Sequence, residues 1–241
     1  MAKHLSFRKR IFLTLCLVTL ISVAPFLALI VISLRQDAMQ RIQQYQEDSI
    51  SLRKQQLQSI IDATTGMAHE DIARTRAGIR TEHEARRRFL EKVAAMRYDS
   101  GAGYIWVHEF KPSTPGDTPR MVLNLALPSS MGRPIDRAYE GFDITRVNVG
   151  PDTFSIRDSR LTRLGVPTSP MLMEMNRLCA RQGAGYLQYF WVRPGAEPTD
   201  STVGYRKLSF VKLIPEWNWV VGTGVYLDDI EIFVLDEADR M

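Results

Sequence analysis

Cysteine and histidine are scarce in this 241-residue sequence, which argues against two kinds of site. The two cysteines are Cys16 and Cys179. Because Cys16 lies in a long apolar run, Cys179 has no partner for an intrachain disulfide. The four histidines, at positions 4, 69, 83 and 108, do not show metal-ligand spacing. We therefore expect no disulfide framework and no metal site, and we predict that Cys179 is a small core residue.

Catalytic signatures are missing as well. The sequence contains no H-E-x-x-H, no G-x-S-x-G, no phosphate-binding loop and no G-x-G-x-x-G. His108 and Glu109 are adjacent, but neighbouring strand residues point to opposite faces of a sheet and cannot act as an acid–base pair. The sequence thus predicts a protein that is not an enzyme and has no cofactor.

Basic charge is not spread over the chain, although the formal net charge is +4. Four of the 31 Lys and Arg residues lie in the first ten positions, which leaves 27 basic and 27 acidic residues in the remainder. A basic excess confined to ten residues before an apolar run is a membrane-topology signal. We therefore expect no nucleic-acid partner.

Residues 11–34 contain no charged side chain over 24 positions, and roughly 20 apolar residues suffice to cross a bilayer. A cleaved signal peptide would have a shorter apolar region and a small-residue cleavage site, which Ser33–Gln36 does not offer. Pro25 is tolerated in such a helix. The cations before the run outnumber Arg35 after it, so a single-pass topology with a cytoplasmic N-terminus is predicted.

Two helices are expected after this span. Apolar residues recur at steps of seven, four, seven and four along 36–78, which predicts one long helix with a single apolar stripe. That stripe suits packing across a sheet, and a homodimer seam is the other interpretation. Thr81 and Glu84 form a capping box that begins a second helix with an apolar face at Ala85, Phe89, Val93 and Met96.

Five strands are predicted from period-two alternation and turn residues: 103–109, 121–127, 186–193, 207–214 and 217–226. In the second strand, Asn124 is expected on the face opposite Met121, Leu123, Leu125 and Leu127. Residues 128–170 are irregular and are predicted to form an extended loop with short helices over one side of the sheet, as a binding loop or lid. Ser169 and Pro170 begin a helix through 171–181, and Asp228 or Asp229 caps another over 230–239. The predicted fold class is α+β, with a five-stranded antiparallel sheet.

Aromatic residues with polar tips recur two positions apart on these strands. Such a face, with one cation at Lys207, would bind a small anion, because ligand pockets are mostly apolar and aromatic with few placed polar groups. Asn124 and tyrosine hydroxyls would hydrogen-bond the remainder of the ligand. Ordinary core packing of the aromatics, with an exposed Lys207, is the alternative. The candidate ligand-binding residues are Tyr104, Trp106, Asn124, Tyr189, Trp191, Tyr205 and Lys207.

Five segments resemble the single-Cache extracytoplasmic sensor domain of bacterial chemoreceptors and sensor kinases: residues 98–107, 119–124, 185–195, 207–212 and 215–230. The resemblance covers the chain from about Gln36 onward, and the last segment is its most specific part. It implies a PAS-like sheet behind a long membrane-proximal helix. It also implies that Tyr104, Trp106, Tyr189, Trp191 and Lys207 line a pocket for a small organic acid. Where the family commonly has His-Pro, this sequence has Asn124-Leu125, and residues 143–170 are longer than usual.

Together these expectations give five regions: a cytoplasmic flank (1–10), a transmembrane helix (11–34), a membrane-proximal helix (35–80), a ligand-binding domain (81–230) and the start of a C-terminal helix (231–241). The predicted function is a chemotaxis-type sensor, anchored in the bacterial inner membrane, whose periplasmic domain signals through its membrane-proximal helices. An anchored solute-binding or scaffolding protein without its own output is the alternative. Because no second span follows residue 230, we expect a truncated or split receptor, or a separate signalling partner.

Overall fold

The computed structural model describes residues 7–111, 119–134, 144–149, 152–155, 171–194 and 202–227. The chain divides into two compact units, residues 1–48 and residues 49–240. The predicted helix start at Ser169-Pro170 and the predicted C-terminal helix over 230–239 lie outside the described residues.

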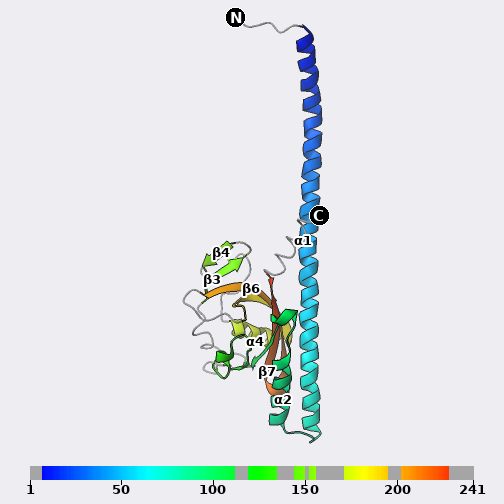
Figure 1. Cartoon of the computed structure of the whole chain (residues 1–241). Coiled ribbons are helices and arrows are strands. Elements are labelled where there is room, and N and C mark those ends of the chain that lie inside the picture. Colours follow the sequence, from blue (N-terminus) through cyan, green and yellow to red (C-terminus); the bar gives the residue numbers. More distant parts are fainter. Residues whose placement is uncertain are drawn as a thin grey trace. The chain divides into compact units, whose positions relative to one another are not determined.

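Helix α1 runs from Phe7 to Arg76 and contains both helices predicted for 11–34 and 36–78 (Figure 1). In the first unit its apolar side chains are exposed, and its hydroxyls bond inside the helix, since Thr19 donates to the Leu15 carbonyl at 3.0 Å and Ser22 to the Val18 carbonyl at 2.6 Å. Among the described residues it is the one helix long and apolar enough to cross a membrane. Transmembrane insertion remains a prediction from length and composition.

In the second unit, the predicted apolar stripe of α1 is confirmed. Leu57, Ile61 and Ala68 are fully buried, and Ile72 nearly so. Helix α2, Glu82–Ala95, begins where the capping box predicts, because the Thr81 side chain accepts a hydrogen bond from the Glu84 amide. Its buried face consists of Ala85, Phe89 and Val93. Both helices therefore direct one apolar face to the same core.

The sheet has seven strands in the part of the chain that the structure describes, in the order β2-β1-β7-β6-β3-β4, with β5 pairing to β6 outside this path. The five predicted strands are confirmed as β1, β2, β5, β6 and β7, and their pairings with one another are antiparallel. Their bounds are Ile105–Glu109, Met121–Leu123, Ala184–Trp191, Thr202–Ile214 and Trp219–Tyr226. The α+β fold class is confirmed.

The prediction of a loop through 128–170 is wrong at two places. Residues Ile144–Val149 form β3 and Asp152–Ser155 form β4, an antiparallel pair. Strand β3 also pairs with the start of β6 in parallel. This pairing joins segments far apart in the chain, which local alternation does not reveal. The short helix η2, Pro128–Ser130, does fall in the region where short helices were expected.

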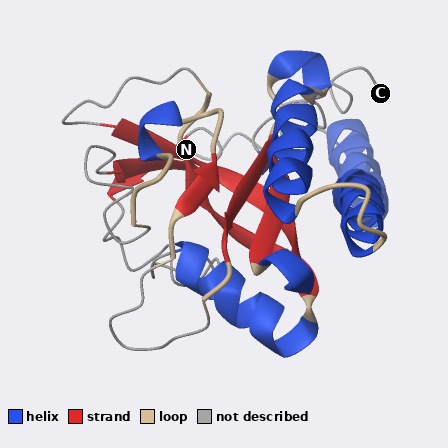
Figure 2. Ribbon diagram, turned by 90° about the horizontal axis from the view of Figure 1, so that it is seen from below, coloured by secondary structure: helices blue, strands red, loops and turns tan. Residues whose placement is uncertain are grey.

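The two faces of the sheet contact different helices (Figure 2). On β6, Leu208, Phe210 and Ile214 belong to the core with α1 and α2. The alternate residues face helix α4, Met171–Gln182, where Val211 joins a second core with Leu172 and Met175. The sequence prediction that one face of this strand packs and the other differs in character is confirmed.

Two glycines of β7 lie on the α4 side and make room for neighbouring side chains. A Cβ atom at Gly222 would overlap the Trp106 indole, and one at Gly224 would overlap the Ser209 hydroxyl and lie 3.0 Å from Cε of Lys207. Gly66 of α1, by contrast, has nothing within 4 Å of a built Cβ. Glycine at 222 and 224 is therefore required for packing of the aromatic face.

Replacement of these glycines by alanine should have opposite effects at the two kinds of position. Gly222→Ala should lower the free energy of unfolding by about 1–3 kcal/mol, because Trp106 must move. The control, Gly66→Ala, should raise it by about 0.5–1 kcal/mol, because alanine favours an exposed helix position. Denaturant unfolding of the full chain in detergent measures both. Equal stability of Gly222→Ala and the unmodified chain would contradict the described packing.

Candidate functional site

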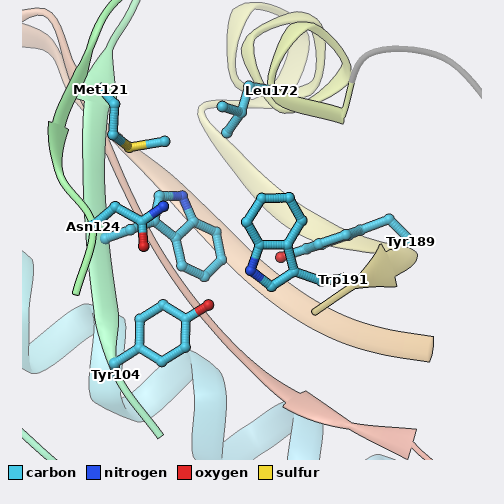
Figure 3. A pocket seen from close by; sticks show the side chains of 7 residues that line it. Tyr104, Met121, Asn124, Leu172, Tyr189 and Trp191 are labelled. Atoms are coloured by element: carbon cyan, nitrogen blue, oxygen red, sulfur yellow. The ribbon is translucent and has the colours of Figure 1, made fainter. Parts of the chain in front are cut away.

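A cavity lies on the α4 side of the sheet, between β1, the residues after β2, β5 and the start of α4. The space between its lining side chains is about 230 Å³, a figure that includes open solvent, and the enclosed part is about 10 Å³, roughly the room that one water molecule needs. Figure 3 shows Asn124 and Tyr104 across the cavity from Tyr189 and Trp191. The lining side chains are Tyr104, Trp106, Met121, Asn124, Leu172, Tyr189 and Trp191. A ligand of several heavy atoms would therefore need these side chains to move apart.

Lys207 lies beside this cavity in the middle of β6, with no exposed surface. Its Nζ donates a hydrogen bond to the Tyr104 hydroxyl at 2.8 Å. The same nitrogen lies 4.2 Å from the ring centroid of Tyr104, 5.0 Å from that of Tyr226 and 5.5 Å from that of Trp106. Among the described residues, no carboxylate lies within ion-pair distance of it. The ammonium is thus held by aromatic rings and one hydroxyl.

Burial changes the acid–base properties of this group. It lowers the pKa of Lys207 from 10.5 to about 7, because the charged form loses its hydration. It also raises the pKa of the Tyr104 phenol above its ordinary value, although hydrogen bonding with Trp191 and Tyr226 opposes the rise. Tyr104 is therefore a neutral partner that cannot compensate the charge of Lys207.

Asn124 presents its amide nitrogen to the cavity because its oxygen is engaged elsewhere. The Oδ1 atom accepts hydrogen bonds from the backbone amides of Ala126 at 3.1 Å and Leu127 at 3.2 Å. This turn fixes the orientation of the amide. Nearby, the buried Nε1 of Trp106 has no hydrogen-bond partner. Since both groups donate hydrogen bonds, the cavity suits a ligand that accepts them.

Two other hydroxyls facing the α4 side have partners within the protein. The Tyr189 hydroxyl lies 3.0 Å from the Ser209 hydroxyl, and the Tyr226 hydroxyl donates to the Val192 carbonyl at 2.5 Å. These bonds hold the rings that surround Lys207 and the cavity. The hydroxyls of these two tyrosines thus hold their rings in place around the site.

His108 lies on the α4 side of β1 but outside the cavity lining. Its Nε2 is 3.2 Å from Oδ1 of Asn176 in α4, and burial lowers its pKa to about 4. The imidazole is therefore neutral at physiological pH. Cys179 is a buried core residue of α4, as predicted, with its thiol pKa raised to about 12 by burial.

Five of the seven predicted ligand-binding residues line the cavity: Tyr104, Trp106, Asn124, Tyr189 and Trp191. Lys207 reaches it through Tyr104. Tyr205 is not among the lining residues, because its ring packs against Tyr226, with centroids 6.5 Å apart, and under the guanidinium of Arg193. The expectation of an exposed Lys207, the alternative interpretation, is wrong.

Sequence reasoning missed two lining residues and assigned one face wrongly. Met121 lies on the cavity side with Asn124, although the sequence placed them on opposite faces. A register shift between β1 and β2 places Met121 opposite His108 and Leu123 opposite Val107, so these two residues lie in different cores and simple alternation fails within the strand. Leu172 comes from α4, and the helix-to-sheet packing that places it there leaves no local sequence signal.

Comparison with known proteins identifies similar sequences. A family model described as Cache domain matches residues 31–135 and 152–239. The methyl-accepting chemotaxis protein McpP of Pseudomonas putida is 28% identical over 156 residues, which are 64% of this chain and 22% of that protein. The sensor histidine kinase MctS of Rhizobium johnstonii is 47% identical over 51 residues, 21% of this chain and 10% of the kinase. The chain thus spans a small part of these relatives.

Solved structures with a similar fold are sensor domains. A periplasmic sensor domain of a chemotaxis protein superposes with a TM-score of 0.54 and 28% identity, covering 74% of this chain and 98% of that one. A second structure, described as the structural basis for carboxylic acid recognition by a Cache chemosensory domain, gives 0.53 and 23%, covering 76% and 98%. At 23% identity, the second structure supports a similar fold and nothing about function.

Removing the buried amine should stabilise the chain in the absence of ligand. Lys207→Met should raise the free energy of unfolding below pH 7 by several kcal/mol, since each pKa unit is worth about 1.4 kcal/mol. The unfolded chain binds the extra proton between the folded pKa of about 7 and 10.5, so the unmodified chain gains stability as the pH rises there, and the advantage of methionine shrinks. Denaturant unfolding at pH 6–9 measures this.

The matched control is Lys212→Met on the same strand, where the amine is partly exposed and pairs with Asp62 at 2.6 Å. It should show no such pH-dependent gain, because a partly exposed amine is not strongly desolvated. A Lys207→Met variant that is less stable than the unmodified chain at pH 6 would contradict the assignment of Lys207 as an uncompensated buried cation.

Proposed function

This chain belongs to the Cache domain family, and we propose that it is a membrane-anchored, extracytoplasmic sensor that binds a small carboxylate. The residues the structure describes contain one sheet, which favours a single-Cache arrangement. The observation that supports this proposal is the buried amine of Lys207, which has a hydroxyl and ring faces around it but no carboxylate from the residues that the structure describes. A ligand carboxylate would supply the opposite charge that such a group requires. Asn124 and Trp106 would donate further hydrogen bonds to it.

We infer the membrane topology from the sequence, and the relatives support it. The apolar part of α1 would cross the inner membrane, with the basic flank in the cytoplasm and the second unit in the periplasm. Both relatives named above are signalling proteins, a chemotaxis receptor and a sensor kinase. We propose that occupancy of the cavity biases α1, and through it a cytoplasmic signalling module or partner of this kind.

Contacts within the second unit join the site to α1. The backbone carbonyl of Tyr104 accepts a 2.7 Å hydrogen bond from the Thr223 hydroxyl. The Thr223 hydroxyl lies 2.5 Å from that of Tyr98, on the opposite side of the sheet from the cavity. Asp99, next to Tyr98 and in a left-handed conformation with φ of 47°, pairs with Arg53 of α1 at 3.2 Å. This chain of contacts would transmit a shift of Tyr104 to α1 if it has two arrangements.

Ligand binding is tested by thermal stability of the full chain in detergent. Acetate, propionate, lactate, succinate and glycine are added in turn. A carboxylate at one hundred times its dissociation constant should stabilise the folded state by about 2.7 kcal/mol, seen as a rise in Tm. Lys207→Ala should abolish this rise, while Lys212→Ala should retain it. No rise with any member of the panel would contradict the proposed ligand class.

Coupling to α1 is tested by amide hydrogen exchange. Addition of the stabilising carboxylate should change the protection of α1 amides between Ser49 and Arg76. Tyr98→Phe should reduce this change while leaving ligand affinity nearly unaltered, because only the hydroxyl contact to Thr223 is lost. The control, Tyr186→Phe, removes a hydroxyl that donates to the Lys54 carbonyl of α1 at 2.9 Å but has no bond to Thr223 or Tyr104. An equal loss in both variants would contradict the proposed route.

A further inference from the structure

The groups around Lys207 leave its charge uncompensated from every side. The neighbouring strands contribute phenols, Tyr104 from β1, Tyr189 from β5 and Tyr226 from β7, which are neutral below their ordinary pKa of about 10. Among the described residues of the core between the sheet and α4, the other buried ionisable groups are His108 and Cys179, both kept neutral at pH 7 by burial.

A second cation packs on one of the rings that surround Lys207. The guanidinium of Arg193 lies 5.0 Å from the ring centroid of Tyr226, on which Lys207 also packs. The positive charge of Arg193 therefore disfavours the ammonium form of Lys207 and does not neutralise it. The described residues around the amine thus provide no anion that would hold its proton.

The site accommodates a neutral amine as well as an ammonium. At 2.8 Å, the Tyr104 hydroxyl accepts a hydrogen bond from an ammonium or donates one to the lone pair of a neutral amine. The ring faces of Tyr104, Trp106 and Tyr226 attract the cation but only in part replace the water it has lost. Lys207 can therefore be a neutral amine or an ammonium in the folded chain.

We propose that anion binding in this cavity takes up one proton at Lys207, so that the empty site holds a neutral amine above neutral pH and the occupied site an ammonium. The proposal rests on the proposed carboxylate ligand. The carboxylate itself stays ionised between pH 6 and 8, since its pKa is near 4, and the proton comes from solvent. Binding of anion plus proton is equivalent to binding of the undissociated acid, so the sensor responds to acidity as well as to concentration.

The affinity should accordingly depend on pH in one direction. The pKa of about 7 in the empty site predicts an affinity that is constant below pH 6 and falls about tenfold per pH unit well above 7. The ligand loses no charge over this range, so the fall would report Lys207 alone. A purely structural lysine would leave the affinity independent of pH.

Calorimetric titration of the full chain in detergent with acetate tests this inference. Measurements in phosphate and in Tris, which differ in their enthalpy of ionisation, give the number of protons taken up. We expect close to one proton per acetate at pH 8 and nearly none at pH 6. Lys207→Arg, whose side chain cannot lose its proton, should show no uptake at either pH, whereas Lys212→Met should behave like the unmodified chain.

A second measurement does not depend on acetate binding, either by the unmodified chain or by a variant. In chain labelled with ¹³C at the lysine ε carbon, the Lys207 signal, identified by its loss in Lys207→Met, should titrate near pH 7 without acetate. Titration above pH 9, or acetate binding without proton uptake at pH 8, would overturn the inference and leave the proposed function intact. Titration near pH 7 without binding of acetate or any other panel carboxylate would contradict the proposed function and, with it, the inference that binding takes up a proton.

Discussion

The structure depends on one strand that buries a charged residue on one face and a hydrocarbon core on the other. Strand β6 is hydrogen-bonded on both edges, by β5 and by β7, around Lys207. The two pairings fix its register, so Lys207 and Ser209 face the cavity while Leu208 and Phe210 face α1 and α2. A shift by one residue would put an amine into the apolar core and a leucine into the site. The buried charge therefore specifies the alignment of the sheet as strictly as the core does.

Tyr104 connects the two faces of this sheet. Its side chain contacts Lys207 on the cavity side, and its backbone carbonyl accepts from Thr223 on the helix side. Thr223 is fully buried and belongs to β7, the strand in which Gly222 and Gly224 leave space for the aromatic face. A displacement of Tyr104 would consequently change contacts in both cores. Such a position can couple a small ligand to helices that it does not touch.

Local patterns predicted most of the architecture, and their failures have physical causes. The stripe of α1, the Thr81 cap and the alternation of β6 were predictable because each depends on neighbours in sequence. Strands β3 and β4, the position of Leu172 and the packing of Tyr205 depend on contacts between distant segments. The cavity side of Met121 was missed because a register shift between β1 and β2 puts Met121 and Leu123 in different cores. Burial of Lys207 needed both flanking strands and could not be read from its own segment.

The turn at Asn124 separates what the fold requires of this residue from what a ligand would encounter. The fold uses the side-chain oxygen, which accepts from the amides of Ala126 and Leu127, and aspartate would supply the same oxygen. The nitrogen facing the cavity would then be replaced by a second, negatively charged oxygen. A single nucleotide change from an asparagine to an aspartate codon would thus convert a donor into an acceptor without disturbing the backbone. The exchange would therefore reverse the hydrogen-bonding preference of the cavity, at the desolvation cost of a carboxylate in a buried position.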